Sequence, residues 1–217
     1  LVNYNLPPVL QLVLVSLFGG VIAALFGFFV GASTLRLRGD YLAIITLAFG
    51  EIVKYIVQNL DFLGGATGLN NIPRIIDFSN SYFIVVISIV IIAMAMTSRK
   101  GKEILSIRED EIAAENIGMR LSRIKLYGFA FSAFFAGIGG SLFAHNIGIL
   151  KPDKFGFLFS IEILVMVVLG GLGSITGAII SAILLTSLNE VLRDVSQFRY
   201  LIYAVILIAL MIFRPSG

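Results

Sequence analysis

Residues 9–31 read VLQLVLVSLFGGVIAALFGFFVG, a run of 23 positions without a charged side chain. Crossing the ~30 Å hydrocarbon core of a bilayer takes roughly 20 apolar residues in a helix. This run is therefore long enough to cross once, and further apolar runs follow it along the chain. Together they predict an all-α fold, a polytopic transmembrane helical bundle.

The composition agrees with that fold class. Hydrophobic residues make up 58% of the 217 residues, charged residues make up 13%, and the mean hydropathy is +0.99. A soluble domain carries roughly 25% charged residues. The pI near 9.3 would suit nucleic-acid binding, but the bases lie in short loops beside apolar segments, the pattern of a membrane protein. The absence of cysteine excludes disulfides and thiolate metal sites.

Seven apolar segments meet or approach the length of a span. They are residues 9–31, 41–60, 82–97, 126–144, 157–172, 175–192 and 200–213. Only Gly173 and Ser174 separate the fifth from the sixth, so these two either cross fully or form a re-entrant pair with a helix break near 170–174. Such a break is tolerated only where protein or a water-filled cavity surrounds it.

We expect one membrane domain over residues 1–217. The chain begins without methionine or a basic leader, so no signal peptide is expected, and one or both ends are expected to be incomplete.

The loops predict an orientation. If all seven segments cross, one side holds ten Lys and Arg residues, seven of them within residues 99–125, and the other side holds five. Loops rich in Lys and Arg stay in the cytoplasm. The loop 98–125 is therefore predicted to be cytoplasmic, whether or not the fifth and sixth segments cross.

That loop carries the signals of a short helix. Ser106 and Glu109 have the spacing of a capping box, in which each side chain bonds the backbone N–H of the other residue. Asp110 and Glu111 would join Glu109 in the first turn, where the helix dipole favours each negative charge by ~0.3–1 kcal/mol. Gly118 predicts the end of the helix. A soluble partner could push on such a helix; the alternative is a solvated loop helix without a partner.

Four stretches carry a resemblance to a known family. Residues 112–118 read IAAENIG and resemble the EAA loop of ABC importer permeases, which docks into a cytoplasmic ATPase. Three more are similar, in the same order, to the branched-chain amino-acid permease family of LivM type: residues 35–51 (LRLRGDYLAIITLAFGE), 64–73 (GGATGLNNIP) and 160–177 (SIEILVMVVLGGLGSITG). The similarity covers most of the chain, from about residue 35 to 215.

The match departs from the family in two respects. The general EAA pattern has a glutamate where this chain has Ile112, and it has a later Ile and Leu-Pro where this chain has Gly128 and Ala130-Phe131. The docking role therefore rests on position and helix signals as well as on the residues. Members of the family usually have further N-terminal spans.

The resemblance implies the membrane-spanning permease subunit of an ATP-driven importer, with a translocation path for branched-chain amino acids, in a prokaryotic inner membrane. It implies a cytoplasmic ABC ATPase, a second homologous permease subunit and an extracytoplasmic solute-binding protein as partners. No cofactor is expected in this chain, since the ATPase uses the ATP. Coupling to the ATPase is assigned to the following residues: Ser106, Glu109, Asp110, Glu111, Ala113, Ala114, Glu115 and Gly118.

Three charged residues fall inside apolar segments. Glu51 and Lys54 are three positions apart and so share a helix face, and Glu162 lies near the start of the fifth segment. A charge at mid-bilayer costs about 2.5–3.5 kcal/mol on insertion scales, so such residues face protein or a cavity. They either line a path for a zwitterion or make structural contacts, such as a mutual ion pair or an approach of Lys54 to the interface.

Glycines inside the segments allow two interpretations. Gly170, Gly171 and Gly173 could break a helix at the translocation site, leaving helix ends to meet the charged groups of a substrate. The alternative is close helix packing, for which two ridges of small residues at a spacing of four are typical. These ridges are Gly27 with Gly31, and Gly173 with Gly177 and Ser181.

Other chemistries fit this sequence poorly. Residues 64–68 are glycine-rich, but no Gly-Lys-Ser/Thr follows as in a phosphate-binding loop. The single histidine, His145, cannot form a metal site with the usual number of ligands. No Ser/His/Asp set is present, so we do not expect an enzyme. An ion-coupled transporter that uses Glu51 or Glu162, and the same ABC architecture for urea, an amide or another small solute, stay open as alternatives.

Overall fold

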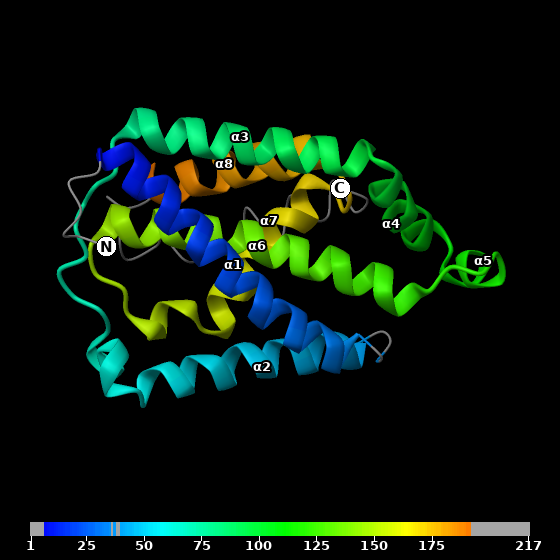
Figure 1. Cartoon of the computed structure of the whole chain (residues 1–217), viewed down its shortest axis with the longest axis horizontal. Helices are drawn as coiled ribbons and strands as arrows, with labels where there is room; N and C mark the ends of the chain where they lie inside the picture. Colours follow the sequence, from blue (N-terminus) through cyan, green and yellow to red (C-terminus); the bar gives the residue numbers. More distant parts are fainter. Residues whose placement is uncertain (1–6, 36, 38–39, 192–217) are drawn as a thin grey trace. The chain divides into compact units, whose positions relative to one another are not determined.

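The computed structural model describes residues 7–35, 37 and 40–191 (Figure 1). The chain divides into two compact units, Leu1–Asp153 and Lys154–Gly217, and each is treated by itself below. The predicted seventh segment, 200–213, lies outside the described residues, as do several of the loop arginines. The assignment of residues 1–217 to one domain stays a prediction.

Four described helices are long and apolar enough to cross a membrane, and all lie in the first unit. They are α1 (Pro8–Thr34), α2 (Asp40–Gln58), α3 (Phe78–Thr97) and α6 (Leu121–Ile147). Two short helices, α4 (Arg99–Glu109) and α5 (Glu111–Asn116), join α3 to α6 (Figure 1). The first four predicted segments are thereby confirmed as helices, and the all-helical membrane fold with them.

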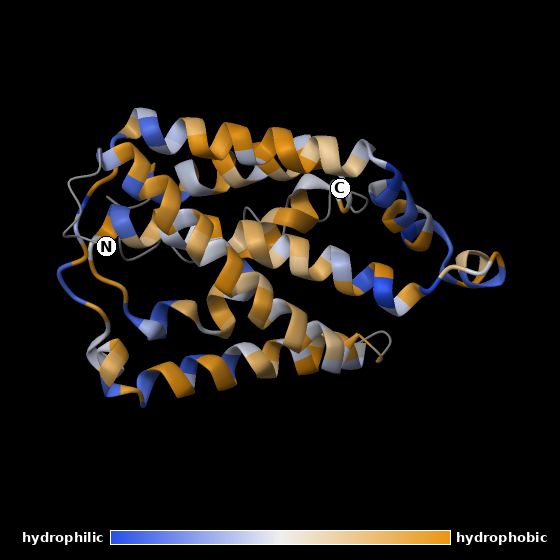
Figure 2. Ribbon diagram, in the orientation of Figure 1, coloured by the Kyte–Doolittle hydropathy of each residue, from blue (hydrophilic) through white to orange (hydrophobic). Residues whose placement is uncertain are grey.

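Large apolar side chains point outward from these long helices. Phe29 on α1 is 69% exposed and Met94 on α3 is 66% exposed, and Figure 2 shows α1 and α3 as largely hydrophobic ribbons. Exposing so much apolar surface to water would be unfavourable, because each Å² raises the free energy by about 25 cal/mol. Lipid or further membrane helices must cover these faces.

α1 and α6 pack antiparallel along a line of small residues. Gly27 and Gly31 are buried on α1, and a Cβ added to Gly27 would lie 2.5 Å from the Cβ of Ala133 on α6. A Cβ on Gly137 would lie 2.6 Å from the carbonyl oxygen of Gly19. Within lipid the hydrophobic effect does not drive helices together. Small residues allow the close backbone contact that stabilises a helix pair there. The predicted Gly27–Gly31 ridge is thus confirmed as a packing surface.

The loops at the far end of α6 are tied to the loop before α3. The N–H groups of Leu69 and Leu150 donate to each other's carbonyl oxygens at 3.0 and 2.9 Å. Arg74 Nη2 donates to the carbonyl of Ile147 at the last turn of α6, at 3.2 Å. Gly68 has φ +78°, and a Cβ there would lie 2.9 Å from the Cα of Lys151. The glycines of residues 64–68 therefore serve a close backbone turn, which also contains the 3₁₀ helices η1 (Asp61–Leu63) and η2 (Gly65–Thr67).

The described part of the second unit is a hairpin of two apolar helices, α7 (Phe157–Gly170) and α8 (Ile175–Val191); a 3₁₀ turn, η3 (Pro152–Phe155), precedes α7. The Ser181 hydroxyl donates to the carbonyl of Met166 at 2.6 Å, so the two helices run antiparallel. With 14 residues, α7 is ~21 Å long, less than the ~30 Å core of a bilayer. Whether the hairpin crosses fully or re-enters stays a prediction.

The predicted break near 170–174 is confirmed as the turn of this hairpin. Gly171 and Gly173 have φ of +92° and +90°, which residues with a side chain rarely adopt. A Cβ on Gly177 would overlap the carbonyl oxygen of Gly170. The predicted ridge is therefore partly wrong, because Gly173 lies in the turn and Gly170 takes its place in the close contact with Gly177.

Candidate functional site

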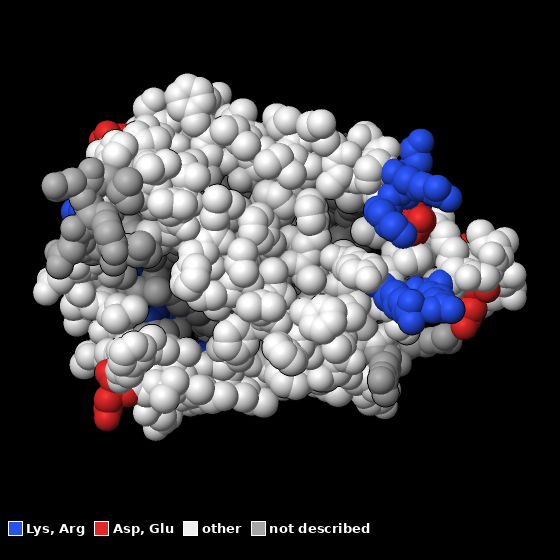
Figure 3. All heavy atoms as spheres, in the orientation of Figure 1, with Lys and Arg blue, Asp and Glu red and all other residues white. Residues whose placement is uncertain are grey.

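The bases of the first unit gather at the end where α4 and α5 lie. The segment between α1 and α2 and the segment from the end of α3 to the second turn of α6 together contain nine Lys and Arg residues, whereas the loops at the other end of this unit contain Arg74 and Lys151. On the face drawn in Figure 3, most Lys and Arg atoms surround α4 and α5. This end is the candidate site for a soluble partner.

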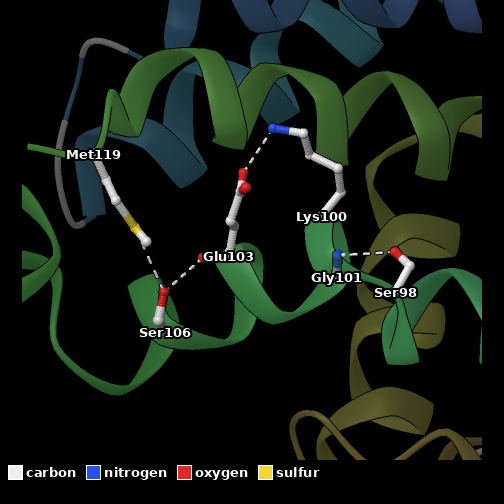
Figure 4. Close-up of polar contacts among 6 residues, drawn as sticks. All are labelled: Ser98, Lys100, Gly101, Glu103, Ser106 and Met119. Carbon is white, nitrogen blue, oxygen red and sulfur yellow. Dashed lines mark hydrogen bonds and ion pairs between the residues drawn. The ribbon is translucent and has the colours of Figure 1, made fainter.

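A tight elbow joins α3 to α4. The Ser98 hydroxyl oxygen accepts a hydrogen bond from the N–H of Gly101 at 3.2 Å (Figure 4), and the same hydroxyl donates to the carbonyl of Ala95 at 2.5 Å. A Cβ on Gly101 would overlap the backbone oxygens of Ala95 and Met96. Serine is a preferred N-cap residue, and its place directly after an apolar run was the available signal for this missed helix start.

The predicted capping box of Ser106 and Glu109 is wrong. Ser106 lies inside α4, where its hydroxyl donates to the carbonyl of Glu103 at 2.9 Å and lies 3.7 Å from Met119 Sδ (Figure 4). Glu109 is the last residue of α4, and its carboxylate pairs with Arg108 at 2.6 Å. The physical reason is that Ser98 starts the helix, and no proline interrupts it before residue 109.

The second short helix has its own start and stop. Asp110 is in extended conformation, and its carboxylate accepts hydrogen bonds from the N–H groups of Ile112 and Ala113 at 2.9 and 3.0 Å. At the other end Gly118 has φ +86°, and its N–H donates to the carbonyl of Glu115 at 2.9 Å. The predicted stop at Gly118 is confirmed, whereas the predicted start is moved from Ser106 to Asp110.

Both short helices are held to α6. Ile107 of α4, Ala114 of α5 and Leu121 of α6 form a buried cluster, against which Met119 also packs. The N–H of Met119 donates to the carbonyl of Ala114 at 3.2 Å, which together with the Gly118 bond makes a Schellman motif. A shift of α5 therefore carries the start of α6 with it.

An ion pair adds to that attachment. Glu111 on α5 pairs with Lys125 on α6 at 2.7 Å. Glu111 is the first residue of α5, where its charge also suits the helix dipole. Of the predicted coupling residues, Glu111 and Ala114 thus hold α5 in place.

The outer face of α5 is uncovered. Ile112 is 73% exposed and Ile117 is 76% exposed, and Ala113 and Glu115 are exposed beside them. Two β-branched apolar residues, one near each end of this short helix, are thus exposed among charged residues. Aliphatic side chains in such positions are available for contact with a protein partner.

A hollow of about 470 Å³ opens between α5 and α6. Its walls include Glu111 and Glu115 from α5, Arg120 from the linker, Arg123 and Lys125 from α6, and Leu35 after α1. Most of its lining is charged, and neither Ile112 nor Ile117 lines it.

The charged residues of α2 pair with each other. Lys54 Nζ lies 2.5 Å from the Glu51 carboxylate and 4.8 Å from the centre of the Tyr55 ring. This geometry agrees with the structural alternative, a mutual ion pair within one helix. A role of Glu51 and Lys54 in a translocation path stays a prediction.

The carboxylate of Glu162 has a partner on the neighbouring helix of its hairpin. Asn189 Nδ2 donates to Glu162 Oε1 at 3.1 Å. No sequence pattern connects these two residues, since 27 positions separate them. In the same unit, Gly170, Gly171 and Gly173 lie at the closed end of the hairpin, about two helical turns from Glu162.

The described residues contain no group of three or more metal-ligating side chains. His145 is buried on α6, where its Nδ1 lies 2.8 Å from the carbonyl oxygen of Ser141. This histidine is therefore part of the helix packing.

Comparison with known proteins gives a family match. The family model described as branched-chain amino acid transport system / permease component matches residues 1–214. The permease protein LivM of the high-affinity branched-chain amino acid transport system of Salmonella typhimurium is 36% identical over 91% of this chain and 55% of its own length. No solved structure matches the chain.

Two more distant relatives carry other names. The permease protein LivH of the high-affinity branched-chain amino acid transport system of Escherichia coli is 28% identical, over 55% of this chain and 39% of the relative. The autoinducer 2 import system permease protein LsrC of Yersinia enterocolitica is 29% identical, over 76% of this chain and 49% of the relative. The chain spans about half the length of the curated relatives it matches.

Proposed function

The chain belongs to the family of permease components of branched-chain amino acid transport systems, and on this premise we propose that it provides the translocation path of an ATP-driven importer. It is a multi-pass protein of the inner membrane, and its family consists of transport proteins rather than enzymes. The proposed cargo is a branched-chain amino acid.

The proposed coupling point is the outer face of α5. The nine Lys and Arg residues at that end favour the cytoplasmic side. The observation that carries the proposal is that α5 exposes Ile112 and Ile117 while both its ends and its inner face are fixed. A cytoplasmic ATPase that presses on these two side chains would move a rigid element.

The motion would pass to the spans through contacts already described. The Ser98–Gly101 elbow joins α4 to α3, and the pair of Glu111 with Lys125 joins α5 to α6. Nucleotide-driven closure of the ATPase would then bias α3 and α6 between outward-open and inward-open arrangements. A ligand shifts such an equilibrium only if it favours one arrangement over the other. ATP bound to the ATPase would supply this preference.

We propose the following division of labour. The chain binds no cofactor itself, the ATPase hydrolyses ATP, and an extracytoplasmic solute-binding protein delivers the cargo. The similarity to LivH supports a second, related permease subunit beside this one. The exposed apolar faces of the long helices leave room for such a neighbour within the bilayer.

The residues of the path are a separate proposal. We propose that Glu162 and the turn at Gly170, Gly171 and Gly173 face the path, with the positive-φ glycines allowing the backbone to approach a solute. Glu51 and Lys54 would stabilise α2 as an ion pair and bind no solute.

The test is purification of the complete transporter with its ATPase, with uptake measured in proteoliposomes. We expect I112D and I117D each to lose co-purified ATPase and ATP-dependent leucine uptake, because a carboxylate cannot be buried unpaired in an apolar contact. I149D is the matched control, since Ile149 is an exposed isoleucine in the loop after α6, and it should retain the ATPase.

Two outcomes would count against this function. If both variants kept the ATPase and full uptake, α5 would not be the coupling point. If uptake by the intact protein needed no ATP and followed an ion gradient instead, the chain would be an ion-coupled secondary transporter.

A second candidate is the same type of permease with another solute. The similarity to LsrC, whose name specifies autoinducer 2, favours this alternative. Competition of leucine uptake by isoleucine, valine, urea and small amides discriminates the two, since only the branched-chain amino acids should compete for the proposed cargo site.

A further inference from the structure

The bases around α4 and α5 divide into paired and unpaired residues. Lys100, Arg108 and Lys125 pair with the carboxylates of Glu103, Glu109 and Glu111. Within the described part of the chain, four bases of the same region make no ion pair: Arg99, Lys102, Arg120 and Arg123. Two of these four, Arg120 and Arg123, line the hollow between α5 and α6.

Their placement at the start of α6 does not suit the dipole of that helix. Arg120 is the N-cap residue of α6 and Arg123 lies in its first turn, which contains no acidic residue. The start of a helix carries a partial positive charge that opposes nearby cations by ~0.3–1 kcal/mol each. An anion between the two guanidinium groups would relieve both effects and would accept their hydrogen bonds.

The hollow lies beside the start of the apolar part of α6. The apolar part of α6 begins at Leu126, and the exposed Tyr127 beside it is of the type enriched at membrane interfaces. Leu35, directly after α1, also lines the hollow, with Met119 and Leu121. A ligand here meets guanidinium groups and apolar side chains together.

From this combination we infer that the hollow binds the phosphate group of an anionic phospholipid. Arg120 and Arg123 hold the phosphate, and Leu35 and Leu121 contact the glycerol and upper acyl carbons. Basic pockets at the cytoplasmic ends of membrane helices are suited to such headgroups. Free phosphate would leave the apolar side of the hollow uncovered. An acidic segment of a protein arriving across α5 would first meet Glu111 and Glu115.

The lipid would contact the connection between α5 and α6. Glu111 and Lys125, whose ion pair attaches α5 to α6, are both walls of the hollow. A bound anionic lipid would therefore stiffen this attachment, and the lipid composition would tune how well α5 transmits a push. Binding itself depends neither on cargo nor on an ATPase, so it can be tested apart from the proposed function.

The experiment is native mass spectrometry of the full chain, titrated with phosphatidylglycerol or with phosphatidylcholine of identical acyl chains. Each guanidinium group that contacts the lipid phosphate is expected to contribute about fivefold in affinity. We expect the double variant R120Q/R123Q to bind phosphatidylglycerol about 30-fold more weakly and each single variant about fivefold more weakly, with phosphatidylcholine binding unchanged.

The matched control is R99Q/K102Q, which removes the same charge from two unpaired bases outside the hollow. It should change phosphatidylglycerol binding less than threefold; an equal loss in both double variants would overturn the inference in favour of unspecific surface charge. If the double variant does not fold, the two single variants give the same test.

Two further measurements separate the lipid from other occupants. Millimolar inorganic phosphate should not displace phosphatidylglycerol; displacement would mean a general phosphate site. The lipid should also remain when the ATPase is bound, because its loss on assembly would show that a protein group fills the hollow.

Discussion

Replacing Gly101 by alanine should loosen the elbow between α3 and α4. The added Cβ would overlap the backbone oxygens of Ala95 and Met96 and lie 2.6 Å from the carbonyl carbon of Met96. Backbone atoms cannot rotate away as side chains do, so the cost lies near the upper end of overpacking, ~3 kcal/mol. The better helix propensity of alanine returns ~1 kcal/mol. The expected net loss of local stability is ~2 kcal/mol.

Hydrogen exchange of the backbone amides of α4 measures this loss directly. A loss of ~2 kcal/mol corresponds to exchange that is about 30-fold faster, and the amide of Gly101, which donates to the Ser98 hydroxyl oxygen, should respond most. The thermal stability of the spans should change little, because the overlap is confined to the last turn of α3.

G139A is the matched control. Gly139 is also helical, on α6, and a Cβ there meets nothing within 4 Å, so this variant should keep or slightly raise stability. Unchanged exchange in α4 of G101A would refute the reasoning, because the elbow would then have room for a side chain.

The remaining predictions concern the cap of α5, the α1–α6 contact and the ion pair of α2. D110A should speed exchange of the Ile112 and Ala113 amides by about fivefold, for the ~1 kcal/mol that an N-cap contributes, whereas D110N should not. G27L should lower the melting temperature in detergent, because a Cβ at position 27 would lie only 2.5 Å from the Cβ of Ala133. An unchanged melting temperature would contradict the close packing. E51Q should lower the melting temperature and leave the KM for uptake unchanged; a large change in KM would instead assign Glu51 to the path.

The membrane fold follows from residue order alone. An apolar run of 20 residues has no stable place in water, and the regular helix is the structure that satisfies its backbone within a bilayer. The end of α5 follows as directly, because Gly118 is suited to the positive φ that closes a helix. The Gly27–Gly31 ridge was likewise predictable, since spacing by four places both residues on one helix face.

The start of α5 could not be read in the same way. Ser106 and Glu109 have the spacing of a capping box, but a cap acts only where a helix begins, and the Ser98–Gly101 elbow had already started α4. Ser98 caps α4 and Asp110 caps α5, so Ser106 lies inside a helix that had already begun. Local spacing carries no information about which of two possible starts is used.

Contacts between residues far apart in the sequence could be identified only from the tertiary structure. Asn189 faces Glu162 because the glycine turn folds α8 back on α7. Among the residues that the structure describes, Arg120 and Arg123 make no ion pair, whereas Lys125 pairs with Glu111, which α5 brings within reach of α6. Charge in a sequence can be counted, but whether a charge is neutralised depends on distances of a few ångströms, which only the folded chain sets.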